Sequence, residues 1–139
     1  TINGVKTLCT KSLGSYKETF FEWTAFPMAV DFKSTRIACG LLEGWHHTPT
    51  FNEIEYHEDA ELFYFLEGPA LMLFVDIKAG KAVMESAQIV RIPAGTELSI
   101  DPGKGHFVAV AEGDTMKALV VAPVQDSPRI TLDETVCGE

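Results

Sequence analysis

Residues 55–68 read EYHEDAELFYFLEG, and this stretch decides the fold. Glu55 and His57 flank Tyr56, and because successive side chains of a strand alternate between its faces, the two polar residues project to the same side. Glu61 belongs to the following strand and can turn to meet them. One imidazole and two carboxylates that converge from paired strands form a ligand set for a divalent metal or an acid–base pocket.

The same alternation is also typical of a strand with one solvated face and one face toward the core, so the pattern leaves both interpretations open. His46 and His47 are weaker candidates. They follow Trp45 and precede Thr48-Pro49, as in a loop. Because adjacent residues of a strand point in opposite directions, at most one of them would join the pocket.

Length and composition predict one globular domain over residues 1–139. Of these residues 46% are hydrophobic and 22% are charged, which excludes a disordered chain. The net charge of −9 argues against nucleic acid and against an anionic membrane as partners. The odd number of cysteines, without metal-type spacing, favours free thiols in a reducing compartment. No apolar segment approaches about 18 residues and no signal peptide is apparent, so we expect a cytoplasmic protein.

Short β-type runs recur roughly every eight to twelve residues from residue 36 onward. The expected strands are Arg36–Leu42, Phe51–His57, Glu61–Leu66, Leu71–Ile77, Ala87–Ile92, Glu97–Ile100, His106–Ala111 and Met116–Ala122. Turns rich in Gly, Pro and Asp separate them. Such a series, without a long helix, predicts an all-β sandwich or barrel.

The two ends of the chain are expected to differ from the barrel. An edge strand should run into a short, weak helix around Ser12–Lys17, and residues 1–35 should form an N-terminal cover. The barrel is expected to span residues 36–133. Residues 134–139 are expected to be a loose tail.

Two predicted strands, Leu62–Leu66 and Leu71–Val75, are apolar on both faces. A sheet with one wet side would alternate, so something must cover the second side. The N-terminal segment, a second sheet or another copy of the chain could do so. Since a barrel of this length leaves little spare chain, we expect a homodimer.

A second polar cluster lies between residues 92 and 107. Ile92-Pro-Ala-Gly95 is followed by Asp101-Pro-Gly-Lys-Gly-His106-Phe107. This segment predicts a hairpin whose Pro-Gly turn is held by Asp101, with His106 at the start of the next strand. On these grounds alone, a satisfied strand histidine and a ligand or catalytic residue are equally good interpretations of His106.

Together these motifs resemble those of the cupins. His57, Glu61 and Gly68 have the spacing of the back half of the first cupin motif, whose front position, usually histidine, is Glu55 here. Cupins commonly place the last metal ligand three residues after Pro-x-Gly, and that position is Leu98, which cannot bind a metal. The resemblance implies a single-domain cupin, a double-stranded β-helix or jelly-roll barrel, with a short N-terminal helix.

Within the cupins, the chain resembles the ureidoglycolate lyase (ureidoglycolate hydrolase) branch. The matching segments are Val5–Leu8 with Leu13–Tyr16, Glu53–His57 with Phe63–Gly68, and Asp101–His106. That family splits ureidoglycolate into glyoxylate and urea, which requires one group to remove the hydroxyl proton and another to protonate the leaving nitrogen. The resemblance implies a lyase in which His106 is base or acid, Asp101 and Glu61 are its partners, and His57 orients or ligates.

The charge of this pocket favours a cation. Glu55, Glu61 and Asp101 would repel a carboxylate substrate unless a metal neutralised them or burial kept some of them protonated. We therefore expect a divalent ion, such as Mn, Fe, Ni or Zn. The expected ligands are Glu55, His57, Glu61 and His106. Arg91, Glu55 and His57 are expected to contact the substrate, although Arg91 is equally consistent with a solvated face.

Two further functions remain open from the sequence. One is a metabolite- or metal-binding cupin without turnover. The other is a metal-dependent isomerase of sugars or keto acids. A bound metal with an open coordination position favours an enzyme, whereas an empty, apolar barrel favours binding alone.

Overall fold

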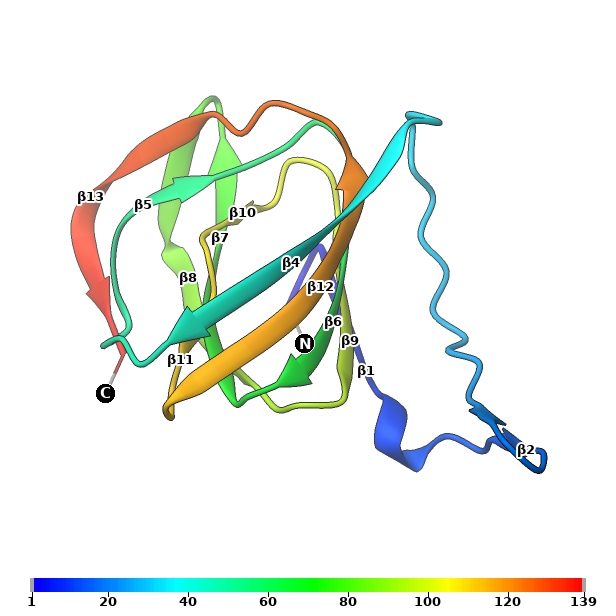
Figure 1. Cartoon of the computed structure of the whole chain (residues 1–139). Helices are drawn as coiled ribbons and strands as arrows, with labels where there is room; N and C mark the ends of the chain where they lie inside the picture. The colour runs from blue at the N-terminus through cyan, green and yellow to red at the C-terminus, as the bar shows by residue number, and fades with distance from the viewer. Residues whose placement is uncertain (1, 139) are drawn as a thin grey trace.

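The computed structural model describes residues 2–138 and is built almost entirely of β-strands (Figure 1). The elements are β1 (Val5–Cys9), the 3-10 turn η1 (Thr10–Ser12), β2 (Tyr16–Lys17), β3 (Glu22–Trp23), β4 (Ile37–Trp45), β5 (Thr50–Glu55), β6 (Glu61–Glu67), β7 (Ala70–Lys78), β8 (Lys81–Ile92), β9 (Thr96–Ile100), β10 (Gly105–His106), β11 (Val110–Ala111), β12 (Thr115–Pro123) and β13 (Arg129–Cys137). Within residues 2–138, no helix has the length and apolarity needed to cross a membrane.

Two sheets of antiparallel strands curl around a common interior (Figure 1). One sheet has the strand order β1-β9-β6-β12-β4, and the other has the order β11-β7-β10-β5-β13, with β8 paired to β7. This is the arrangement of a jelly-roll barrel. The expectation of an all-β barrel is confirmed.

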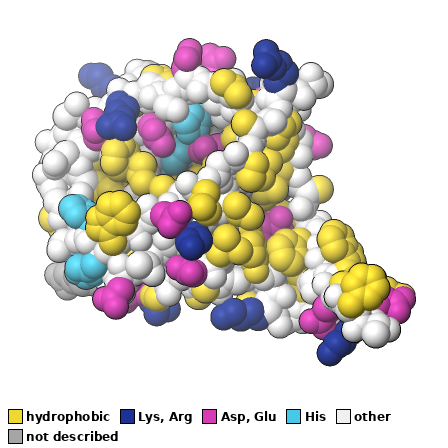
Figure 2. Space-filling model, in the orientation of Figure 1, with side chains coloured by type: hydrophobic (Ala, Val, Ile, Leu, Met, Phe, Trp, Pro, Cys, Tyr) yellow, Lys and Arg dark blue, Asp and Glu magenta, His cyan; other side chains and the backbone are white. Residues whose placement is uncertain are grey.

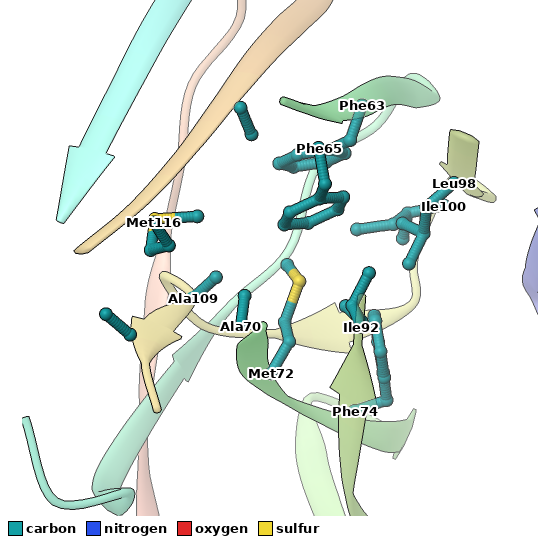
Figure 3. Packing of buried hydrophobic residues seen from close by; sticks show 12 residues of the cluster. Phe63, Phe65, Ala70, Met72, Phe74, Ile92, Leu98, Ile100, Ala109 and Met116 are labelled. Atoms are coloured by element: carbon teal, nitrogen blue, oxygen red, sulfur yellow. The ribbon is translucent and has the colours of Figure 1, made fainter. Parts of the chain in front are cut away.

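The main core fills the space between the two sheets (Figure 3). Phe63 and Phe65 enter it from β6, and their rings stack with centroids 5.9 Å apart. Met72 and Phe74 enter it from β7 on the opposite sheet. Because these four residues alternate along their strands, each strand turns one face inward.

The other face of β7 packs into a second core. Leu73 and Val75 contact Phe51, Ile54 and Leu132 there, and side chains of β8 and β13 complete the cluster. The double-sided apolar pattern of Leu71–Val75 is therefore explained within one chain, because β5, β8 and β13 of the same curled sheet cover the second face of β7. A second copy is not needed to cover this strand.

The N-terminal helix was a wrong prediction. Only Thr10–Ser12 forms a 3-10 turn, and Tyr16–Lys17 is strand β2. The turn has no side-chain N-cap, and Gly14 and Ser15 follow it, so little favours a helix there. We call residues 13–36 the arm. It leaves the barrel, forms the β2–β3 hairpin away from it, and returns to β4 (Figure 1).

The arm is attached at two places near its return. The Phe26 ring lies 5.1 Å, centroid to centroid, from Tyr64 on the outer face of β6. The Asp59 carboxylate accepts hydrogen bonds from the backbone N–H groups of Lys33 and Ser34. Residues 1–35 thus contribute β1 to the sheet, but the hairpin covers no other part of the described chain.

The C-terminal boundary was also wrong, because residues 134–137 belong to β13 rather than to a loose tail. Val136 packs in the second core, and it pairs with Phe51 of β5. Other strands also differ from expectation. The strand expected to end at Leu42 continues to Trp45, and the strand expected to reach His57 ends at Glu55. The segment His106–Ala111 is divided into β10 and β11, and the strand expected at Ala87 begins at Lys81.

Gly105 is required where β10 passes over the second core. A Cβ at this position would lie 2.7 Å from the Val75 carbonyl oxygen and 2.8 Å from Ile54 Cδ1. Since the first of these atoms is backbone, a side chain here would displace β10. The absence of a side chain at Gly105 thus lets β10 carry His106 into the barrel.

Candidate functional site

Strand pairing brings Glu55 and His106 together. They are directly opposite each other in the β5–β10 ladder, so their side chains lie on the same face. The distance from His106 Nε2 to Glu55 Oε1 is 3.8 Å. His106 is almost completely buried, whereas Glu55 retains some exposure.

His57 and Glu61 join this pair from the β5–β6 connection. His57 lies two residues beyond the end of β5, and Glu61 is the first residue of β6. One carboxylate oxygen, Glu61 Oε1, lies 3.0 Å from His57 Nε2 and 2.9 Å from His106 Nε2. The two imidazole rings are 5.1 Å apart, centroid to centroid. His57 from the loop and His106 from β10 therefore both converge on one carboxylate oxygen of β6.

The far nitrogen of each ring faces a backbone carbonyl. His57 Nδ1 lies 3.0 Å from the Asp126 carbonyl oxygen, and His106 Nδ1 lies 2.9 Å from that of Lys104. A carbonyl can only accept, so this network assigns a proton to each Nδ1. In the neutral rings, both Nε2 atoms then carry lone pairs directed at Glu61.

The centre of the site consequently brings three acceptor atoms together. His57 Nε2, His106 Nε2 and Glu61 Oε1 are all buried, and none has a conventional hydrogen-bond partner among the described residues. Such an arrangement is costly unless protons or a cation lie among the acceptors. Ligands of an ion at about 2.1 Å lie roughly 3 Å apart when adjacent in an octahedron, which matches the two Glu61 distances.

Glu55 extends this set. Ligand atoms of Glu55, His57 and His106 all lie within 4.8 Å of one another. Glu61 is not part of this group of three, but its Oε1 contacts the Nε2 atoms of both histidines. A histidine ligand whose second nitrogen donates to a backbone carbonyl is the usual way that proteins orient metal-binding imidazoles.

Without a cation, protonation relieves the same conflict, and the pKa values shift accordingly. Burial by itself would raise the pKa of Glu61, but the contacts with His106 and His57 and their charges outweigh burial and lower it to about 2. Burial by itself would lower the pKa of His57, but the contacts with Glu61 and the Asp126 carbonyl, with the charges of Glu61 and Glu55, raise it.

These shifts predict how the stability of the metal-free protein depends on pH. Glu61 has its pKa lowered from 4.5 to about 2, so its stabilising contribution is complete above pH 4.5 and is lost as the pH falls toward 2. His57 has its pKa raised from 6.5, so its contribution is complete below pH 6.5 and is lost as the pH rises through the folded-state pKa. In the presence of a chelator, we expect the free energy of unfolding contributed by this pair to be greatest between these limits.

Urea denaturation from about pH 2 to about pH 9 measures this profile. Asp59, whose lowered pKa reflects its backbone hydrogen bonds rather than its burial, also contributes to the acid side. The informative variant is therefore Glu61→Gln, which should reduce the loss of stability between pH 4.5 and about 2 without abolishing it. An acid limb as steep in Glu61→Gln as in the wild type would contradict the paired arrangement.

A cavity of about 140 Å³ opens beside these groups, inside the barrel. Its polar lining is Glu55, Glu61 and His106, and the remainder is mostly apolar, including Phe63 and Met72. Figure 2 shows acidic and histidine side chains in a hollow of this face. No arginine or lysine within residues 2–138 lines the cavity.

A larger pocket of about 730 Å³ lies along Tyr56, Glu58 and residues 124–128. The loop on this pocket supplies the Asp126 carbonyl to His57, which connects it with the buried cluster. The smaller cavity is the candidate site, because Glu61 and His106, two of the three residues with unpartnered buried acceptor atoms, line it. The third residue, His57, contacts Glu61 but is not part of the lining.

Several residues expected at the site lie elsewhere. Asp101 is exposed in a turn that borders a different pocket with Lys104, away from the cavity lining. Arg91 is exposed, and its Nε donates to Glu112 at 2.7 Å. Leu98, at the usual position of the last cupin ligand, is fully buried in the main core.

His46 and His47 are both exposed and line a separate pocket with Arg91. Neither residue lines the cavity, which agrees with their weaker standing as candidates in the sequence. The two backbone carbonyls that orient the rings, of Lys104 and Asp126, were missed in the sequence. A carbonyl belongs to every residue type, so no residue pattern could have indicated them.

Comparison with known proteins gives no match to a family model. It also gives no match among curated proteins. Solved structures do match. RmlC from Streptococcus suis, in complex with dTDP-D-xylose, superposes with a TM-score of 0.55 at 11% identity. The match covers 86% of this chain and 64% of RmlC, so the chain spans less than two thirds of that protein.

Two other structures match over more of the chain. NovW, a 4-keto-6-deoxy sugar epimerase from the novobiocin gene cluster of Streptomyces spheroides, has a TM-score of 0.59 at 13% identity, covering 94% of this chain and 69% of NovW. The WlaRB TDP-quinovose 3,4-ketoisomerase from Campylobacter jejuni has a TM-score of 0.57 at 14% identity, covering 90% and 89%.

At these identities the similarities establish the fold alone, which is a jelly-roll barrel. They connect the chain with structures of sugar epimerases and ketoisomerases rather than with a lyase.

Proposed function

We propose that this protein is a metal-assisted isomerase that moves a proton between adjacent carbons of a small keto sugar or keto acid. The observation that carries the proposal is the group of three buried acceptors, His57 Nε2, His106 Nε2 and Glu61 Oε1, next to a cavity that also exposes Glu55. A cation among the acceptors and a free carboxylate beside it are the two components that such a reaction needs.

In this proposal His57, His106 and Glu61 hold the ion, as two histidines and one carboxylate. Their contacts of 2.9 and 3.0 Å are the shortest in the cluster, and the carbonyls of Lys104 and Asp126 fix both rings. A divalent ion such as Mn, Fe, Ni or Zn suits these mixed donors. When bound, it would polarise the carbonyl oxygen of a substrate and so acidify the neighbouring C–H bond.

Glu55 is the proposed base. It lies farther from His106, at 3.8 Å, and it lines the cavity where a substrate would enter. Its carboxylate would take the proton from the carbon next to the carbonyl, leaving the electron pair on an enediolate. In an isomerisation of an α-hydroxy ketone, the same carboxylate would return the proton to the former carbonyl carbon, while the hydroxyl proton passes to the former carbonyl oxygen. In an epimerisation, the carboxylate would release its proton to solvent, and a water on the opposite face would reprotonate the same carbon. No co-reactant is consumed.

The cavity limits the substrate class. A cavity of about 150 Å³ holds a molecule the size of benzene, so the 140 Å³ available here suits a small keto acid or one sugar ring. A nucleotide attached to such a sugar would lie outside the barrel. Because no cationic side chain of the described residues lines the cavity, the metal would supply the positive charge for an anionic substrate.

The lyase reaction has less support. The resemblance gave His106 two partners, Asp101 and Glu61. Glu61 is in contact with His106, at 2.9 Å, but Asp101 lies in an exposed turn outside the cavity lining. The set of residues implied by the resemblance to ureidoglycolate lyases is therefore assembled only in part.

Proton exchange with solvent tests the proposal whatever the product of the reaction is. The metal-loaded protein is incubated in D₂O with dihydroxyacetone, small 2-keto acids, unsubstituted 4-keto sugars and a dTDP-4-keto-6-deoxy sugar, and deuterium at carbon is followed by NMR. We expect metal-dependent exchange in at least one compound. No exchange above the protein-free rate in any of them would reject the isomerase, and glyoxylate release from ureidoglycolate would restore the lyase.

A further inference from the structure

The outer face of β4 and β12 is apolar and exposed. Strand register places Leu41 beside Leu119, and Cys39 beside Val121, and these side chains share one face with Ile37. We call these five residues the outer patch. Leu41 is 54% exposed, and Figure 2 shows hydrophobic side chains running along both strands. Unlike β7, this face has no second core over it within residues 2–138.

A second apolar surface lies at the end of the arm. The β2–β3 hairpin carries Tyr16, Phe20, Phe21 and Trp23, of which Phe20 is 89% and Trp23 is 64% exposed. Their rings contact one another, with Phe20 and Phe21 5.4 Å apart, centroid to centroid. The hairpin projects beyond the barrel (Figures 1 and 2), so a cluster of aromatic rings is presented to solvent.

The total surface is too large for a compact monomer. The chain exposes 8477 Å², whereas a compact monomer of 15.3 kDa exposes about 7,100 Å². The excess of roughly 1,300 Å² exceeds the approximately 800 Å² that each partner contributes to a stable interface. Exposed apolar surfaces such as the outer patch and the aromatic hairpin are typical of interaction sites.

The outer patch also borders an open sheet edge. β4 ends the order of its sheet, where its neighbour is β12. A nine-residue edge of this kind is a template for further pairing unless something covers it. At one end of the patch, the Lys117 ammonium lies 4.0 Å from the Glu43 carboxylate and 3.8 Å from the Glu67 carboxylate. The positive charge of Lys117 therefore has carboxylate partners within the same chain.

We infer that a second copy of this chain covers the outer patch, in a two-fold dimer in which each aromatic hairpin packs on the β4–β12 face of its partner. One chain carries both the apolar patch and the apolar hairpin. A two-fold axis therefore covers both surfaces of both copies at once. Each copy has a net charge of −9, but the five residues of the outer patch are uncharged, so the patch itself opposes no charge to its partner. The charged residues of the hairpin, Lys17, Glu18 and Glu22, would lie beside its aromatic rings.

The inference does not depend on the proposed function, since it uses neither the cavity nor its ligands. It revises the reason for a dimer that the sequence suggested, which rested on Leu62–Leu66 and Leu71–Val75. The outer face of Leu62–Leu66 lies beside β12 in the same sheet, and Leu66 is exposed. The second face of Leu71–Val75 is covered within the chain, and the unsatisfied surface is instead that of β4, β12 and the hairpin.

Light scattering and sedimentation at tens of micromolar test the inference. We expect the wild type at twice the 15.3 kDa chain mass. Leu41→Glu/Leu119→Glu and, separately, Phe20→Ser/Trp23→Ser should both give monomers. Gln88→Glu/Thr131→Glu is the matched control, since it places two acidic residues on β8 and β13, away from the outer patch, and should remain a dimer. Circular dichroism verifies the β-fold of each variant.

Thiol labelling locates the interface even where a variant fails to fold. Cys9, Cys39 and Cys137 are all exposed in the single chain. In the dimer, Cys39 should react several-fold more slowly with a maleimide than in the dilute protein, while Cys9 and Cys137 should be unaffected. A monomeric wild type would overturn the inference and leave the patch to another partner. A dimer in which Cys39 stays fully reactive and both double variants still associate would place the interface elsewhere.

Discussion

Purified protein should retain about one divalent ion per chain after dialysis, and either His57→Ala or His106→Ala should weaken binding at least about 100-fold. Each substitution removes one of the two Nε2 atoms that converge with Glu61 Oε1, and leaves the remaining acceptors unable to enclose an ion. Elemental analysis gives the stoichiometry, and calorimetric titration with Mn²⁺, Ni²⁺ or Zn²⁺ gives the affinity. At about 100 times the dissociation constant, the ion should stabilise the wild type by about 2.7 kcal/mol.

His46→Ala is the matched control for this experiment. His46 also has its Nδ1 2.9 Å from a backbone carbonyl oxygen, that of Glu112, but it is exposed and lies outside the cavity. Its loss should leave affinity unchanged. If the wild type binds none of these ions and shows no thermal shift, the two histidines instead hold protons beside Glu61, and the cluster is an acid–base site.

Much of the barrel is predictable because strand length and turn chemistry are local properties. The strands Glu61–Glu67 and Thr115–Pro123 end near Gly or Pro, and the sequence predicts the bounds of both to within one residue. The prediction fails at the C-terminal end of the barrel because the structure there depends on contacts between distant residues, which are not a local property. Val136 stands in a short run of Thr, Val and Cys close to the end of the sequence, and its packing against the second core is what orders residues 134–137 as a strand.

The site is predictable where it depends on strand periodicity. The sequence spacing of Glu55, His57 and Glu61 predicts that these three residues lie together. The position of His106 after the Pro-Gly turn makes it the fourth candidate, and the structure brings all four residues together. Asp101 and Arg91 are not predictable in the same way. Each lies on or beside a strand of the barrel, and only the register and twist of that strand decide which side the residue faces.

Replacing Glu55 should abolish most of the activity without loss of the metal, which would distinguish Glu55 from the three proposed ligands His57, His106 and Glu61. In Glu55→Gln, exchange or turnover with the responsive substrate should fall about 10²–10⁴-fold, as expected for loss of a general base, while metal content stays at the wild-type level. The reason is geometric: Glu55 lines the cavity and lies 3.8 Å from His106, whereas Glu61 Oε1 is in closer contact with both rings. Glutamine preserves the size of the side chain but cannot accept the proton.

Two substitutions make this result interpretable. Glu53→Gln changes a carboxylate two residues earlier on β5, which accepts from Arg129 at 2.6 Å and does not line the cavity, and it should leave turnover unchanged. Asp101→Asn should also leave turnover unchanged, although it would disable a lyase of the type that the sequence resembles. If Glu55→Gln loses the ion together with activity, Glu55 is a fourth ligand and the base is another group. Full activity in Glu55→Gln would exclude it from proton transfer, since no conservative amide can replace a carboxylate that must gain and lose a proton in every turnover.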